Sequence, residues 1–121
     1  MRPEKRRLSF TIEGIPKVQK RSRKGRGGHW YAPSSSDQQV IGRIAYEARL
    51  KAKMPVLEGP VLLKIDFYGL RSNADLSNAL KLVEDGCNGV IWIDDRQVSI
   101  LMVFRRAPFG QARTEVSIEE L

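Results

Sequence analysis

Residues Asp75–Val98, DLSNALKLVEDGCNGVIWIDDRQV, decide how this chain folds. The first half has the period of an amphipathic helix, with an apolar side formed by Leu76, Ala79, Leu80, Val83 and Cys87. We expect the helix to begin at Asp75, because a carboxylate there can accept the free N–H groups of the first turn. Gly86 and Gly89 supply the left-handed conformations that commonly end a helix. Of the apolar residues, Leu82 alone falls outside the apolar side.

The other side of this helix is acidic, and it is formed by Ser77, Asn78, Lys81, Glu84 and Asp85. It can be a solvated surface on which Lys81 and Asp85 form an i,i+4 pair, worth about 0.2–0.5 kcal/mol. The adjacent Asp94 and Asp95, which follow the apolar run Val90–Ile93, favour another interpretation. Two neighbouring carboxylates repel each other unless solvent or a cation lies between them. Because Mg²⁺ takes a few carboxylates together with waters and phosphates, we expect this strand-edge pair and the helix carboxylates to form a cation site.

The same residues form a spaced motif. It reads D-x-x-N-x-x-K from Asp75 to Lys81, then Asp85, Asn88-Gly89, and W-x-D-D-x-Q-V from Trp92 to Val98. This pattern resembles the RusA-type Holliday-junction resolvases, which are small phage-associated endonucleases. The resemblance implies that Asp75 and Asp95 are catalytic metal-site residues and that Lys81 is required for cleavage. Members of that family typically carry a further catalytic aspartate two residues after the first, where this chain has Ser77.

The resulting hypothesis is a Mg²⁺-dependent, structure-selective DNA endonuclease that acts on four-way junctions or other branched DNA in recombination and repair. Carboxylate-held metal ions, for which Mn²⁺ is expected to substitute, activate water and offset charge on the phosphate. Asp75 and Asp95 are expected as direct ligands, Asp85 and Asp94 as further ligands or supporting groups, and Lys81 as the cation that stabilises the phosphate or leaving oxygen.

Glu84 has two interpretations. It lies seven residues after Ser77, only about 20° around the helix, and helix side chains lean towards the N-terminus. It is therefore either a further catalytic and metal-binding carboxylate that replaces the one missing at Ser77, or a solvated surface residue. Ser77 also favours an alternative function, a catalytically impaired module that binds branched DNA or RNA. The retained Lys81 and the Asp94–Asp95 pair argue against that alternative, because DNA binding alone is better served without those acids.

The net charge of +7 is concentrated in the first quarter of the chain. Residues 1–30 hold ten Lys or Arg against two Glu, a net charge of +8, whereas residues 31–121 hold eleven Lys or Arg against twelve Asp or Glu, a net charge of −1. Such asymmetry indicates a polyanionic partner. Residues 17–29 are polar, Gly-rich and aperiodic, so we expect a mobile surface loop. Its candidate phosphate contacts are Lys17, Lys20, Arg21, Arg23, Lys24 and Arg26.

The aromatic residues after this loop, Trp30 and Tyr31, can stack on exposed DNA bases or anchor the loop's return to the core. Arg71, in the short connection 69–74, is a further candidate for DNA contact. A symmetric junction needs two cuts related by a two-fold axis, so we expect a homodimer, as the family resemblance also implies.

Periodicity predicts the remaining elements. We expect strands at 8–13, 61–68, 97–106 and 114–118, and a helix at about 34–53. The fold class is α/β (α+β): a single small domain over 1–121 with two helices packed on a mixed, largely antiparallel sheet of about four strands. No apolar run approaches the roughly 18 residues of a membrane span, so no membrane partner is expected. A start without a signal-peptide pattern and a single cysteine indicate the cytoplasm of a bacterial or phage-infected cell.

Overall fold

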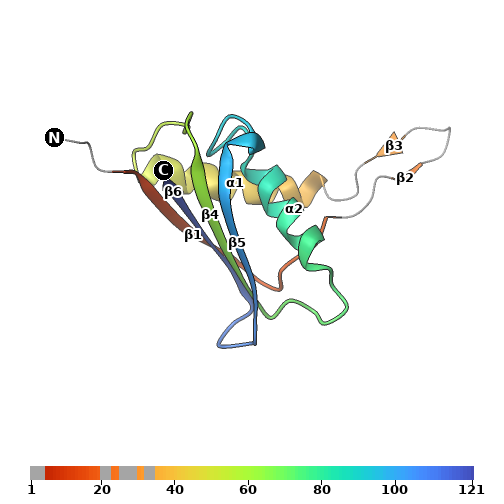
Figure 1. The fold of residues 1–121 in the computed structure, drawn as a ribbon. Helices are drawn as coiled ribbons and strands as arrows, with labels where there is room; N and C mark the ends of the chain where they lie inside the picture. The colour runs from red at the N-terminus through yellow and green to blue at the C-terminus, as the bar shows by residue number, and fades with distance from the viewer. Residues whose placement is uncertain (1–4, 20–22, 25–29, 32–34) are drawn as a thin grey trace.

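The computed structural model describes residues 5–19, 23–24, 30–31 and 35–121. A four-stranded sheet in the order β1-β6-β4-β5 carries two helices on one face (Figure 1). The strands are β1 (Arg7–Glu13), β4 (Val61–Tyr68), β5 (Val98–Arg106) and β6 (Arg113–Glu120), and the helices are α1 (Ser35–Lys51) and α2 (Leu76–Cys87). β4 and β5 are parallel, whereas the other two pairings are antiparallel. The predicted fold class is therefore confirmed.

The core lies between the helices and the inner face of the sheet. Alternate residues of β4 point into it, and Val61, Leu63, Ile65 and Phe67 are each at most 1% exposed. Leu82 of α2 is also 1% exposed, so the expectation that it falls outside the apolar side was wrong. The apolar stripe of α2 is wide enough to include Leu82 because α2 packs against α1 and also shares one buried cluster with the inner face of β4.

Gly86 does not end α2, as was expected, but lies inside it at the contact with α1. A Cβ at this position would lie 2.6 Å from Cγ2 and 2.8 Å from Cβ of Ile41. Glycine is therefore required here by close packing of the helices. Gly89, one residue after the C-cap Asn88, does have the predicted positive φ, 78°.

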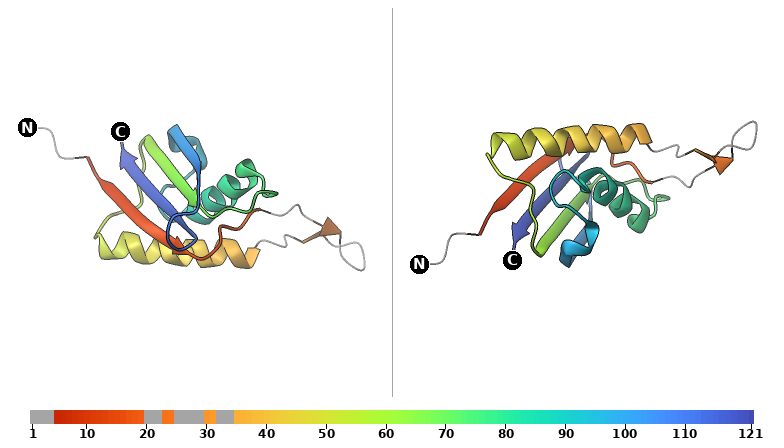
Figure 2. Two further views of the ribbon diagram at one scale, coloured as in Figure 1. Left: turned by 90° about the horizontal axis from the view of Figure 1, so that it is seen from below. Right: turned by 90° about the horizontal axis from the view of Figure 1, so that it is seen from above.

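The unit β4–α2–β5 sets the positions of the acidic residues. Because β4 and β5 are parallel, α2 must run back along the sheet to connect them (Figures 1 and 2). The connection before α2 therefore lies at the carboxyl ends of the two strands, and the segment after it lies at their amino ends. Asp75 belongs to the first of these edges and Asp95 to the second.

The segment Val90–Ile93 is not a strand, which corrects the expectation of a strand-edge aspartate pair. It forms a turn with isolated bridges from Trp92 to Asn88 and Leu57. It leads into a 3₁₀ helix, η2 (Asp95–Gln97), immediately before β5. Only the middle of the run is buried: Ile91 and Trp92 fill the core without extended pairing, whereas Ile93 is exposed.

Part of the expected basic loop is paired. The short strands β2 (Arg23–Lys24) and β3 (Trp30–Tyr31) are antiparallel, with Arg23 opposite Tyr31 and Lys24 opposite Trp30. This ladder lies beyond the N-terminal end of α1, apart from the main sheet (Figure 2). Lys20, Arg21 and Arg26 lie outside the described residues, and mobility of the segment stays a prediction.

Candidate functional site

Asp75 is held at the start of α2, as predicted. It is the N-cap, and its Oδ1 accepts a hydrogen bond of 2.9 Å from the backbone N–H of Ser77. One carboxylate oxygen is thereby engaged, while the residue remains exposed to solvent. Asp75 is therefore positioned by local sequence, and its second oxygen has no hydrogen bond within the described residues.

Arg105 fixes the connection that carries Asp75. Its Nη1 donates to the carbonyl oxygen of Arg71 at 3.1 Å, and its Nη2 donates to that of Ala74 at 2.5 Å. Arg105 reaches this connection because the carboxyl ends of the parallel strands β4 and β5 meet at one edge. Sequence reasoning missed Arg105, since its role depends on a strand pairing that no local pattern reveals.

Asp95 is held by the buried Trp92. The indole Nε1 of Trp92, whose side chain is fully buried, donates to Asp95 Oδ1 at 2.7 Å. The side chain of Gln97 ties the same turn to the chain before β4, because its Nε2 donates to the carbonyls of Leu57 and Gly59 at 2.8 and 2.9 Å. Two residues of the W-x-D-D-x-Q motif, Trp92 and Gln97, thus place the Asp95 carboxylate at a defined position beside the C-terminal end of α2.

Asp94 is engaged differently from Asp95. It caps η2 in a capping box with Gln97, and its side chain accepts from the backbone N–H of Arg96 at 2.9 Å. The Arg96 guanidinium also lies 3.3 Å from its other oxygen. The hydrogen bond from the Arg96 backbone, followed by the contact with its side chain, lowers the pKa of Asp94. This carboxylate is already engaged by Arg96 and supports the turn.

Glu84, Asp85 and Asp95 share one electrostatic environment. The pKa of Glu84 is raised by partial burial and by the negative charges of Asp95 and Asp85. The pKa of Asp85 is raised by burial and by Asp95, although Lys81 acts in the opposite direction. Within the described residues none of these three carboxylates forms an ion pair, so the i,i+4 pair that a solvated face would favour is not formed. The three acids, which we call the acidic cluster, therefore carry negative charge that no ion pair within the described residues offsets.

Residues 17–29, which we call the basic segment, begin with a contact to α2 beside this cluster. The backbone N–H of Gln19 donates to the carbonyl of Asn78 at 2.8 Å. Gln38, in α1, donates through its Nε2 to Gln19 Oε1 at 3.1 Å and to Asp85 Oδ2 at 3.4 Å. The basic segment therefore begins within reach of the acidic cluster. These two glutamines, far from α2 in sequence, were not found by sequence reasoning.

The acidic residues are not gathered around one point. Nine residues of helix separate Asp75 from Glu84, which corresponds to about 14 Å along the axis. In the described part of the chain, no group of three His, Cys, Asp or Glu side chains is close enough to hold one metal ion. The acidic cluster nevertheless fits a divalent cation chemically, because it offers oxygen donors without a neutralising partner. Mg²⁺ commonly binds one or two carboxylates and completes its coordination with water and phosphate.

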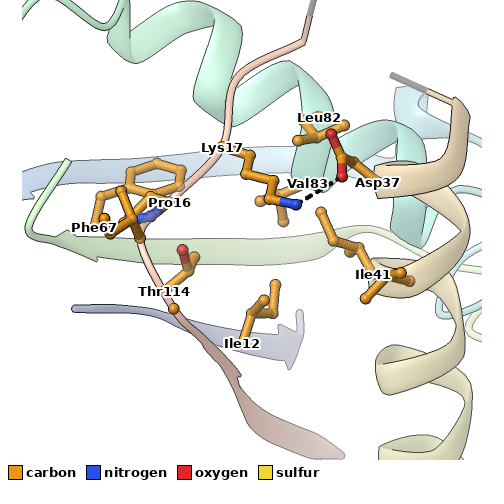
Figure 3. Close-up of a pocket in the computed structure, with 12 residues that line it drawn as sticks. Ile12, Pro16, Lys17, Asp37, Ile41, Phe67, Leu82, Val83 and Thr114 are labelled. Atoms are coloured by element: carbon orange, nitrogen blue, oxygen red, sulfur yellow. Dashed lines mark hydrogen bonds and ion pairs between the residues drawn. The ribbon is translucent and has the colours of Figure 1, made fainter. Parts of the chain in front are cut away.

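Lys17, one of the candidate phosphate contacts, forms an ion pair with Asp37 in the first turn of α1 (Figure 3). The Nζ–Oδ1 distance is 3.0 Å, and the Lys17 side chain is 68% exposed. Beneath this pair lies a small cavity of about 80 Å³, lined among others by Ile12, Ile41, Phe67, Leu82 and Thr114. The ion pair holds residues 14–19 against α1 and leaves the ammonium group accessible.

Comparison with known proteins identifies the family. No helix in the ranges that the structure describes is long and apolar enough to cross a membrane. A search of curated proteins finds no significant match. The family model described as endodeoxyribonuclease RusA matches residues 12–119 of the 121. With that match extending from the end of β1 to the end of β6, this chain belongs to the RusA family of endodeoxyribonucleases.

Proposed function

We propose that this protein is a divalent-metal-dependent, structure-selective endonuclease that cleaves Holliday junctions or other branched DNA in recombination and repair, in the cytoplasm of a bacterial or phage-infected cell. Family membership supports the nuclease chemistry and the junction substrate. The observation that carries the proposal is the contact between the basic segment and α2 beside the acidic cluster. Carboxylates alone repel DNA, so a cation site needs an adjacent source of positive charge to bring phosphate to it.

Each side chain has an assigned part in this chemistry. Mg²⁺ or Mn²⁺, when bound, supplies an activated water and neutralises charge that develops on the phosphate oxygens. Asp95, oriented by Trp92, would hold the metal together with one of its neighbours Glu84 and Asp85, since Mg²⁺ needs only one or two carboxylates besides water and phosphate. Lys81, exposed on the same helix, would contact the phosphate or the leaving oxygen. Asp94 orders the turn through its cap, and ligation of the metal by Asp94 remains a prediction.

Cleavage of synthetic DNA tests this proposal. The protein should cut a four-way junction in Mg²⁺ and leave matched duplex and single strands largely intact. Asp95→Asn should abolish cleavage while junction binding holds or tightens, because it removes a ligand and a charge that repels DNA. Glu58→Gln, an exposed acid outside the cluster, is the matched control and should cleave like the parent. Metal-independent cleavage, or full activity of Asp95→Asn, would refute the mechanism. Junction binding without any cleavage would instead indicate the impaired binding module.

A second test concerns the basic segment. Neutralising Lys20, Arg21, Arg23, Lys24 and Arg26 together should weaken junction binding and flatten its salt dependence. Each lost phosphate contact lowers the slope of log affinity against log salt by about 0.9 for duplex DNA. An unchanged slope would show that the segment does not contact phosphate, and the stacking role of Trp30 would lose its support.

We further propose a homodimer in which two copies share each active site. Asp75 and the acidic cluster lie at opposite ends of α2, yet both are assigned to the metal site. In a two-fold dimer, Asp75 of one copy can approach the acidic cluster of the other. The edge strand β5 also presents apolar side chains that a second copy can cover, since Ile100, Leu101 and Met102 are 45, 44 and 40% exposed.

Mixing two inactive variants tests the shared site. In a dimer formed from one Asp75→Asn chain and one Asp95→Asn chain, a shared arrangement regenerates one intact site. Random reassociation should therefore restore about a quarter of the parental sites, because half of the dimers are mixed. Two measurements would show the restored sites. Cleavage activity should return after mixing, and electron paramagnetic resonance should count the corresponding Mn²⁺ bound per dimer. A monomer in sedimentation, or no recovery after mixing, would overturn the shared site.

A further inference from the structure

A polar groove lies beside Asp75, between the segment that follows β1 and the connection that precedes α2. Its volume is about 460 Å³, within the range of about 300–1,000 Å³ that small-molecule sites occupy. It is lined by Ile15, Pro16, Lys17, Val18, Asp37, Arg71, Asn73 and Ala74. The last two of these residues directly precede Asp75, so whatever occupies the groove lies next to that carboxylate.

The lining is suited to a nucleotide. Lys17 and Arg71 provide two cations at the groove against the single carboxylate of Asp37, which leaves a net positive charge for a phosphate. The Asn73 amide carries both a donor and an acceptor, so it can bond the edge of a base. Ile15, Pro16 and Val18 supply an apolar wall against which the face of a base can pack.

The two walls of the groove are held in place by contacts that do not involve a ligand. Arg105 donates to the carbonyls of Arg71 and Ala74 on one side. The Lys17–Asp37 pair holds the other side against α1. The groove is therefore preformed, and binding in it does not require the protein to order a loop first.

We propose that this groove accepts one unstacked nucleotide of the substrate strand, adjacent to the phosphate that is cut. The proposal rests on the nuclease function and on the shared dimeric site given above, which brings Asp75 of one copy to the acidic cluster of the other, and it adds a source of structural selectivity. Removing a base from a stacked duplex costs a few kcal/mol, and the cost is smallest where pairing is already disturbed. A branch point offers such a base cheaply, whereas a continuous duplex does not.

The experiment uses a fluorescent adenine analogue, 2-aminopurine, placed in turn at each position around the branch of a four-way junction. With EDTA present to prevent cleavage, binding of the parent protein should raise the fluorescence at one position next to the cut, because unstacking relieves quenching. Asn73→Trp fills the groove and should abolish the rise. It should also reduce the preference for junction over duplex by about tenfold, which corresponds to about 1.4 kcal/mol.

Ser72→Trp is the matched control, because Ser72 is the preceding residue of the same exposed connection and does not line the groove. It should retain both the fluorescence rise and the preference for junctions. A parent protein that cleaves junctions without a rise at any position would overturn the proposal and leave the nuclease function intact. So would an Asn73→Trp variant that behaves like the parent. A parent that neither binds nor cleaves branched DNA would instead refute the proposed function.

Discussion

Gly86→Ala tests the packing that positions α2. The added Cβ would lie 2.6 Å from Cγ2 and 2.8 Å from Cβ of Ile41, distances at which one side must move. Ile41 cannot rotate away, because a β-branched residue has essentially one favourable χ1 rotamer in a helix. Overpacking of this kind costs about 1–3 kcal/mol, whereas replacing glycine in a helix gains about 1 kcal/mol. The free energy of unfolding should therefore fall by up to about 2 kcal/mol.

Thermal and urea unfolding measure this change. A loss of 2 kcal/mol corresponds to a fall in Tm of about 8 °C for a domain of this size. In an Ile41→Ala background, the destabilisation caused by Gly86→Ala should be smaller by at least about 0.5 kcal/mol, since the added methyl group then contacts only the Cβ of residue 41. Gly59→Ala is the control and should be neutral or stabilising, because nothing lies within 4 Å of its added Cβ. An increase in Tm for Gly86→Ala, or strict additivity with Ile41→Ala, would refute the close helix contact.

Three further predictions concern individual side chains. Burial and the neighbouring acids raise the pKa of Glu84, so the folded state binds its proton more tightly and stability falls as pH rises from the ordinary glutamate pKa through the raised one. Glu84→Gln should remove this loss of stability with rising pH. Because solvent screens the charges, it should stabilise the protein by only about 0.2–0.5 kcal/mol at neutral pH, and it should have no such effect below the ordinary pKa of glutamate. Urea unfolding at a series of pH values measures the difference. Arg105→Met should raise the Mg²⁺ concentration for half-maximal cleavage by about threefold to tenfold, because it frees the connection that carries Asp75. Arg106→Met, which removes the partner 2.7 Å from the buried Asp66, is the control: it should lower Tm and leave the Mg²⁺ dependence of cleavage unchanged. Mainly through burial, the pKa of the Cys87 thiol is raised to about 12. Iodoacetamide at mildly alkaline pH should therefore modify Cys87 only in denaturant. Rapid labelling of the native protein would contradict the buried position.

Elements of local origin were readable from the residues. The strands at 7–13, 61–68, 98–106 and 113–120 and the helices at 35–51 and 76–87 follow the predicted periods closely. Asp75 as N-cap was also predictable, because its hydrogen bond reaches only two residues along the chain. The spacing of Asp94 and Gln97 also carries a capping-box signal. This signal predicts a helical turn that begins after Asp94, and it separates the role of Asp94 from that of Asp95.

Contacts between distant segments could not be read in this way. Gln38 reaches Asp85 across 47 positions, and Arg105 reaches Ala74 across 31, because folding brings together surfaces whose local patterns carry no information about each other. The same holds for Leu82, which is buried by α1 as well as by the sheet.

The sequence by itself determined the elements, the family motif and the identity of the acidic residues, since these depend on period, spacing and side-chain chemistry. Tertiary structure alone decided that Asp75 and Asp95 lie at opposite ends of α2. The physical reason is the parallel pairing of β4 with β5, which requires the connecting helix to run the length of the sheet and so separates the residues before it from those after it.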